Sequence, residues 1–189
     1  MSEFHLTAEP PLAGYDKAFA GASLKAPADL ALVSIALPLG GEDAAHKAIK
    51  AAYGCALPEV GKACATPRKT AHLLRLGVDQ AFVVFEHAEP DAERVVAEAL
   101  KGAAYTTDQT DVWVALDISG PKARDALERI CPIDLHDDAF AIMDLARTTM
   151  EHLGVIILRT DEERWRLLSA SSSARSFLHA LETSVKNVS

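Results

Sequence analysis

The chain has 189 residues, of which 49% are hydrophobic and 24% are charged. This composition predicts one good-sized domain or two small ones around a buried core, and it excludes a disordered chain. The formal net charge is −8, the opposite sign from that of a typical nucleic-acid binder. The only local basic cluster is Arg68-Lys69 with Arg75 nearby, which is more typical of a solvated face than of a phosphate track.

The three cysteines, Cys55, Cys64 and Cys131, are widely spaced and contain no CxxC pair. This spacing does not indicate a disulfide framework, so we expect a reducing compartment. No secretory pattern opens the chain, and no apolar run reaches the ~18 residues that suggest a membrane span. The sequence therefore predicts a soluble cytoplasmic protein with no nucleic-acid or membrane partner.

The first half alternates strand and helix signals after an irregular start. Residues 1–27 are rich in proline and glycine with little periodicity, which predicts an irregular N-terminal arm of the kind that orders against a partner. The hydrophobic pattern then predicts further elements in chain order. These are a strand at 29–37, a helix at 42–54 capped by Gly54, a loop at 55–69, strands at 70–76 and 80–86, and a helix from Pro90-Asp91 to about Leu100.

The second half repeats much of this order. Residues 111–119 alternate as a strand does, and Gly120-Pro121 opens a helix with proline at its first position. A loop of about a dozen residues follows. The remaining predicted elements are strands near 145–151, 154–159 and 163–169, and a last helix that starts after the capping serines Ser171, Ser172 and Ser173.

The repeated order predicts the fold class. We expect an α+β fold with a duplicated strand-helix-strands-helix unit, in which helices cover one face of mainly antiparallel sheets. The predicted organisation is an irregular arm at 1–27 and a single pseudo-duplicated domain at 28–189, with halves of about 28–104 and 105–189. The two cysteines that follow the helices, Cys55 and Cys131, also match between the halves and are expected to be buried packing residues.

The sequence contains no recognised catalytic motif. There is no GxGxxG after a strand, no phosphate-binding loop, no GxSxG and no HExxH. The stretch CPIDLHDD at 131–138 nevertheless gathers a thiol, an imidazole and three carboxylates. A divalent metal site built from Cys131, Asp134 and His136 is one interpretation of it. The other is structural: Ile133 and Leu135 enter the core, while the aspartates cap and turn.

An ordered set of motifs in the second half resembles the gamma subunit of heterotetrameric sarcosine oxidase over about residues 105–185. The motifs are Asp108-Gln109-Thr110-Asp111 before Trp113, Ile118-Ser119-Gly120-Pro121, Cys131-Pro132-Ile133-Asp134-Leu135, Phe140, Ala146-Arg147-Thr148, and a terminal helix opened by Ser, Ala and Arg. The departures are Asp117 within a strand and Thr110 where serine is common.

The resemblance implies a fold similar to the folate-binding domain of aminomethyltransferases. It also implies a non-catalytic subunit of a flavoenzyme that oxidatively demethylates sarcosine to glycine and passes the one-carbon unit to tetrahydrofolate. FAD, FMN, NAD, tetrahydrofolate and zinc are then expected in the partner subunits alpha, beta and delta. No residue of this chain receives a catalytic, cofactor-binding or metal-binding role, because the matching motifs are not known sites of the family.

Three alternatives stay open at this stage. The related assembly that oxidises N-methylglutamate uses similar small subunits, and the sequence alone does not separate the two substrates. A stand-alone folate-binding protein would need a carboxylate that reaches the pterin, and Asp108, Asp111 and Asp134 are the candidates. A metal-dependent hydrolase would use Cys131, Asp134 and His136.

Overall fold

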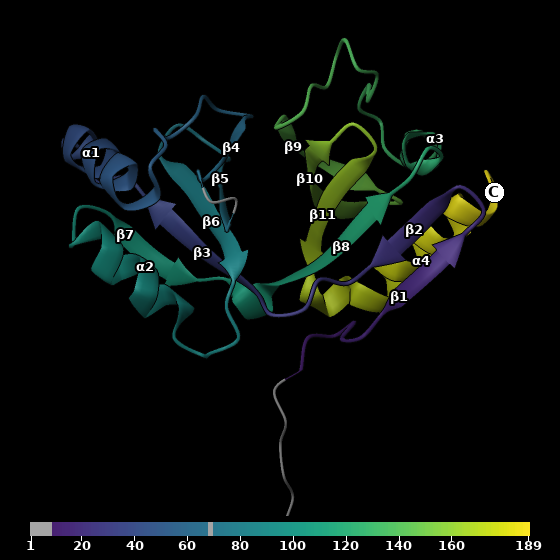
Figure 1. Ribbon diagram of the computed structural model, residues 1–189, viewed down its shortest axis with the longest axis horizontal. Coiled ribbons are helices and arrows are strands. Elements are labelled where there is room, and N and C mark those ends of the chain that lie inside the picture. Colours follow the sequence, from purple (N-terminus) through teal and green to yellow (C-terminus); the bar gives the residue numbers. More distant parts are fainter. Residues whose placement is uncertain (1–8, 68–69) are drawn as a thin grey trace, which may run out of the picture.

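The computed structural model describes residues 9–67 and 70–189, where two antiparallel sheets pack face to face with helices on their outer sides (Figure 1). The larger sheet has the strand order β1-β2-β8-β11-β10-β9. Its strands are β1 (Asp16–Phe19), β2 (Ala22–Lys25), β8 (Trp113–Ser119), β9 (Leu145–Met150), β10 (Leu153–Asp161) and β11 (Arg164–Ala170). Helices α3 (Ala123–Glu128) and α4 (Ala174–Lys186) cover its outer face.

The smaller sheet has the strand order β4-β5-β6-β3-β7. Its strands are β3 (Leu30–Ala36), β4 (Ala63–Ala65), β5 (Ala71–Arg75), β6 (Gln80–Glu86) and β7 (Tyr105–Asp108). Helices α1 (Glu42–Tyr53) and α2 (Ala92–Leu100) cover its outer face. Short 3-10 helices, η1 (Thr110–Val112) and η2 (Ser171–Ser173), precede β8 and α4.

The two sheets share one topology. The series β3-α1-β4-β5-β6-α2 and β8-α3-β9-β10-β11-α4 follow each other along the chain, and their strands take equivalent places in the two sheets. The α+β class with antiparallel sheets, and the repeated order of its elements, are confirmed. Each sheet also contains a strand from outside its own series: β7 pairs with β3, and the early strand β2 pairs with β8. The division into halves at about residue 104 stays a prediction.

Three apolar clusters hold the layers together. One lies between the smaller sheet and its helices and includes Val33, Ile49 and Val96, while another lies between the larger sheet and its helices and includes Trp165 and Phe177. The third lies between the sheets, where Phe82 and Leu32 meet Ile156, Leu158 and Leu168. Strands that are apolar on both faces are expected in a sheet covered on both sides, and β6 and β10 have this pattern.

Several predicted elements match the structure within a few residues, and others do not. The irregular arm predicted at 1–27 is wrong for residues 16–25, which form the hairpin of β1 and β2; residues 1–8 lie outside the described residues. The loop predicted at 55–69 contains β4, and the basic pair Arg68-Lys69 also lies outside the described residues. Ser173 precedes α4 but makes no side-chain capping hydrogen bond, so the predicted capping role is wrong there.

Two glycines are required by the backbone. Gly54 ends α1 in the left-handed region (φ 72°) and its N–H donates to the carbonyl of Lys50. Gly120, between β8 and α3, has φ 113°, and a Cβ placed there would lie 2.7 Å from the carbonyl oxygen of Gly21. The absence of a side chain lets the β1–β2 turn reach α3, where the N–H of Lys122 donates to the same carbonyl.

Candidate functional site

The stretch CPIDLHDD lies in the connection between α3 and β9. Cys131 and Leu135 are buried in the core of the larger sheet, and Ile133 packs against that core while partly exposed. Asp134 is exposed, and its carboxylate accepts a hydrogen bond from the N–H of His136 at 2.9 Å. The apolar residues thus enter the core and an aspartate closes a turn, as the structural interpretation predicts.

A buried arginine anchors the same stretch. The guanidinium of Arg159 donates to the carbonyl oxygens of Phe140, Glu162 and Asp161, and it lies 2.6 Å from the carboxylate of Asp137. Its side chain is only 6% exposed and lies over the ring of Trp165. The hydrogen bond from Arg159 holds the pKa of Asp137 below its usual range. Asp137 therefore serves to fix this connection to β10.

The interpretation of CPIDLHDD as a metal site requires at least three ligand side chains that lie close together. Among residues 9–67 and 70–189, no three His, Cys, Asp or Glu side chains gather closely enough to hold an ion. Cys131 faces the core, while the exposed imidazole of His136 lies 3.5 Å from the carboxylate of Asp138. The structure does not bring Cys131, Asp134 and His136 together.

The three candidate folate carboxylates are also separate. Asp108 is exposed at the end of β7 and accepts a hydrogen bond from the N–H of Thr110. Asp111 lines a cavity of about 50 Å³ beside Trp113, which has room for one or two waters but not for a pterin. Asp134 caps its own turn. The cavity beside Asp111 is lined by neither Asp108 nor Asp134.

A charged cluster that the sequence reasoning missed lies between the sheets. Asp117 of β8 and Arg166 of β11 form two parallel hydrogen bonds of 2.8 Å. The pair borders a cavity of about 520 Å³ that Lys25 and Glu86 also line. Burial would lower the pKa of Arg166, but the hydrogen bonds to Asp117, its charge and the charge of Glu86 together outweigh burial and raise the pKa. Both carboxylate oxygens are occupied, so the arrangement suits structural pairing rather than proton transfer.

His72 of β5 lies near this pair, on the smaller sheet. Burial lowers the pKa of His72, and the charge of Arg166 lowers it further, whereas Asp117 opposes the shift. The imidazole is therefore neutral at pH 7.

The signal in the sequence for the charged cluster was Asp117 itself, a carboxylate inside an otherwise apolar strand, but its partner is 49 residues away along the chain.

The thiol of Cys55 is not activated. Burial and a hydrogen bond with Cys64 raise the pKa of Cys55 to about 12. A thiol with so high a pKa carries almost no thiolate at neutral pH and is a poor nucleophile. Cys131 is buried, as expected. The prediction of a buried Cys55 is only partly correct, because Cys55 is half-exposed at the edge of the core.

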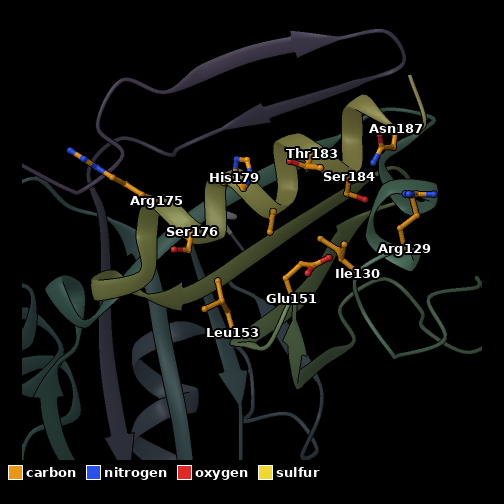
Figure 2. A pocket seen from close by; sticks show the side chains of 11 residues that line it. Arg129, Ile130, Glu151, Leu153, Arg175, Ser176, His179, Thr183, Ser184 and Asn187 are labelled. Atoms are coloured by element: carbon orange, nitrogen blue, oxygen red, sulfur yellow. The ribbon is translucent and has the colours of Figure 1, made fainter.

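An open groove runs along α4 (Figure 2). It has a volume of about 560 Å³ and lies between α4, the end of α3 and the β9–β10 turn. Arg175 and Arg129 lie at opposite ends of it in Figure 2, with Glu151 between them. Ile130 and Leu153 form an apolar floor, and Ser176 and Thr183 add hydroxyl groups. The groove is open and has charged side chains at its rim, and it suits binding better than catalysis.

Within the described residues, no helix is long and apolar enough to cross a membrane.

Comparison with known proteins gives consistent matches. The chain is 32% identical over 126 residues to a sarcosine oxidase subunit gamma of Arthrobacter sp., and 30% identical over 135 residues to that of Corynebacterium sp. strain P-1. The Arthrobacter match spans 66% of this chain and 62% of the relative, which is less than two thirds of that relative's length.

Two solved structures share the fold. A chain of heterotetrameric sarcosine oxidase from Corynebacterium sp. U-96 superposes with a TM-score of 0.79 and 24% identity, covering 96% of each chain. The glycine cleavage system aminomethyltransferase T from Bartonella henselae has a TM-score of 0.63 and 18% identity, covering 85% of this chain and 45% of that one. The family model of the GCVT N-terminal domain matches residues 50–186, and the chain therefore belongs to this family.

Proposed function

We propose that this chain is the gamma subunit of a heterotetrameric sarcosine oxidase. The observation that carries the proposal is its 30–32% identity to three proteins named sarcosine oxidase subunit gamma. The fold shared with a chain of a heterotetrameric sarcosine oxidase, over 96% of both chains, supports it. The whole enzyme would oxidatively demethylate sarcosine to glycine and pass the one-carbon unit to tetrahydrofolate.

The role of this chain in that enzyme is structural. Its most reactive groups are satisfied internally: Asp137 binds Arg159, Asp117 binds Arg166, and the thiol of Cys55 stays protonated. Partner subunits alpha, beta and delta would hold FAD, FMN, NAD, tetrahydrofolate and zinc. No step of the reaction then depends on a side chain of this subunit.

Co-purification tests the proposal. The tagged chain is expressed together with the products of its neighbouring genes, and the eluate is examined for flavin absorbance and for larger subunits. A complex in which this chain and flavin-containing subunits elute together is the expected result. A tagged chain that is folded but elutes alone contradicts the proposal.

The same complex distinguishes two substrates. Sarcosine and N-methylglutamate are supplied separately, and reduction of the bound flavin is followed for each. Faster reduction by sarcosine is expected. Faster reduction by N-methylglutamate would assign the chain to the related assembly instead.

A second candidate function is a stand-alone folate-binding protein of one-carbon transfer. The observation that favours it is the fold shared with the Bartonella aminomethyltransferase. Calorimetric titration of the isolated chain with tetrahydrofolate tests this function. We expect no heat of binding, because Asp111 lines a cavity of only about 50 Å³, while Asp108 and Asp134 accept hydrogen bonds from nearby backbone N–H groups. Saturable binding would favour the second function.

A further inference from the structure

The groove along α4 has an unusual charge for this protein. The whole chain carries a net charge of −8, yet the groove is lined by Arg129, Arg175 and His179 and by a single carboxylate, Glu151. With a neutral histidine the lining is still positive. A cationic groove attracts an anionic partner, and like charge opposes a contact of this groove with the same groove of a second copy.

The arginines of the groove are also not used by the fold. Arg124, Arg159 and Arg166 all pair with carboxylates of this chain. Within residues 9–67 and 70–189, Arg129 and Arg175 have no ion-pair partner, and both side chains are exposed. Their substitution should therefore cost the folded state little, and their charges are available to a second molecule.

The length of the groove indicates the size of the occupant. Arg175 lies in the first turn of α4, and Arg129 lies near Asn187 at its other end (Figure 2). A rise of 1.5 Å per residue places the two ends roughly 18 Å apart. A small anion cannot reach both arginines, whereas an extended segment of about six residues can.

The floor of the groove suits a peptide. Ile130 and Leu153 are partly buried against the core of the larger sheet and offer an apolar base. The hydroxyls of Ser176 and Thr183 and the amide of Asn187 lie along the same face of α4 and can bond to a peptide backbone. The groove thus has an apolar base, a polar wall and charged ends, a combination that is typical of a protein–protein interface.

We propose that this groove binds an acidic segment of the large flavin-carrying partner subunit, with one carboxylate at each arginine. The inference rests on the proposed function, because it takes the partner from that assembly. It adds the surface of this chain that contacts the partner and the charge of the segment that the partner supplies.

The test is charge reversal in the co-expressed complex. The double variant R129E/R175E is compared with the wild type and with K47E/K50E, which makes the same charge change on the exposed face of α1. Retention of flavin subunits on the tagged chain is measured over a series of salt concentrations. We expect R129E/R175E to weaken retention at least tenfold and the control to stay within twofold. Circular dichroism and the midpoint of thermal unfolding should be the same for all three chains.

The outcomes separate the two proposals. Wild-type chain that retains no flavin subunit overturns both of them. Wild-type and R129E/R175E chains that retain flavin subunits equally overturn the groove alone and leave the proposed function standing. Self-association of the isolated chain that R129E/R175E abolishes would assign the groove to a second copy and would also overturn the inference. Retention that weakens with salt in the wild type but not in R129Q/R175Q supports the acidic segment.

Discussion

The hydroxyl of Tyr15 donates a 2.7 Å hydrogen bond to the carboxylate of Glu182, which joins the start of the chain to its last helix. The ammonium groups of Lys17 and Lys186 lie 2.8 Å from the same carboxylate. Hydrogen bonds from Lys17, Lys186 and Tyr15 lower the pKa of Glu182 to about 2. Burial and the bond to Glu182 raise the pKa of Tyr15 above its usual range. One side chain thus fastens the N-terminal hairpin to α4.

Glu182→Gln should weaken this fastening. Glutamine keeps the shape and one acceptor oxygen but loses the charge that the two lysines contact. We expect a loss of about 1 kcal/mol in the free energy of unfolding at pH 7, the usual range for such bonds near a surface. Urea denaturation measures the change. Glu98→Gln on α2, which removes an exposed pair with Arg94, is the control and should change the stability by less than about 0.5 kcal/mol.

The effect of Glu182 should depend on pH. Folding lowers its pKa from 4.5 to about 2, so the folded state binds fewer protons than the unfolded state in this interval. The stabilisation by Glu182 is complete above pH 4.5 and is lost as the pH falls toward 2. The difference between wild type and Glu182→Gln should shrink over the same interval in a series of urea denaturations. A difference at pH 3 as large as that at pH 7 would contradict this account.

Arg159→Met should destabilise the chain strongly. The substitution removes the donors to three backbone carbonyls and the partner of Asp137 in a buried setting. We expect a loss of about 3 kcal/mol or more, since buried polar groups would be left without partners. Arg164→Met is the matched control, because Arg164 is exposed on the neighbouring strand. Equal thermal midpoints for the two variants would show that Arg159 does not anchor the connection.

Local patterns in the sequence were sufficient for the elements that bury their own apolar residues. Strand β3 and helix α1 were predicted within one residue, because an apolar run and a terminal glycine mark their ends. Strands β1 and β7 were missed because their residues are largely exposed and show no periodicity. They are strands because β2 and β3 offer free edges, and this is a tertiary effect.

The side-chain pairs of the site could not be predicted from the sequence, for a related reason. The stretch CPIDLHDD drew attention to Asp137, but its partner Arg159 lies on β10 and becomes adjacent only when the sheet forms. Asp117 and Arg166 are likewise neighbours only through the pairing of β8 with β11. A strand pattern gives the face on which a residue lies but not the register that selects its partner. The structural interpretation of Ile133 and Leu135 succeeded because it needed only their apolar character.

Asp117→Asn should shift the titration of a residue on the opposite sheet. Asp117 opposes the lowering of the His72 pKa, so its loss should lower that pKa further. Titration of the imidazole by NMR measures this shift. The variant should also lose about 2 kcal/mol of stability, since Arg166 then lacks its carboxylate in a mostly buried site. Asp16→Asn, which breaks an exposed pair with Lys25, should leave the pKa of His72 unchanged.

The stability of the fold at mildly acidic pH should also depend on His72. Because folding lowers the pKa of His72, the unfolded state binds more protons as the pH falls below 6.5. The free energy of unfolding should therefore decrease in that direction. His72→Phe, which keeps the ring volume without a titrating group, should reduce this decrease. A decrease of the same size in the variant would assign the acid sensitivity to other groups.

The stretch CPIDLHDD provides the last prediction, because its apolar and reactive residues can be separated. Leu135 is fully buried, and Leu135→Ala should cost about 2–5 kcal/mol through lost burial and the cavity that remains. His136 is exposed, and His136→Ala should change the stability by less than about 0.5 kcal/mol. In the assembled complex His136→Ala should also leave the turnover of sarcosine and the zinc content unchanged. Loss of activity in a His136→Ala complex that stays assembled would show that this stretch has a chemical role. Loss of stability in Leu135→Ala alone would show that the stretch contributes to the core.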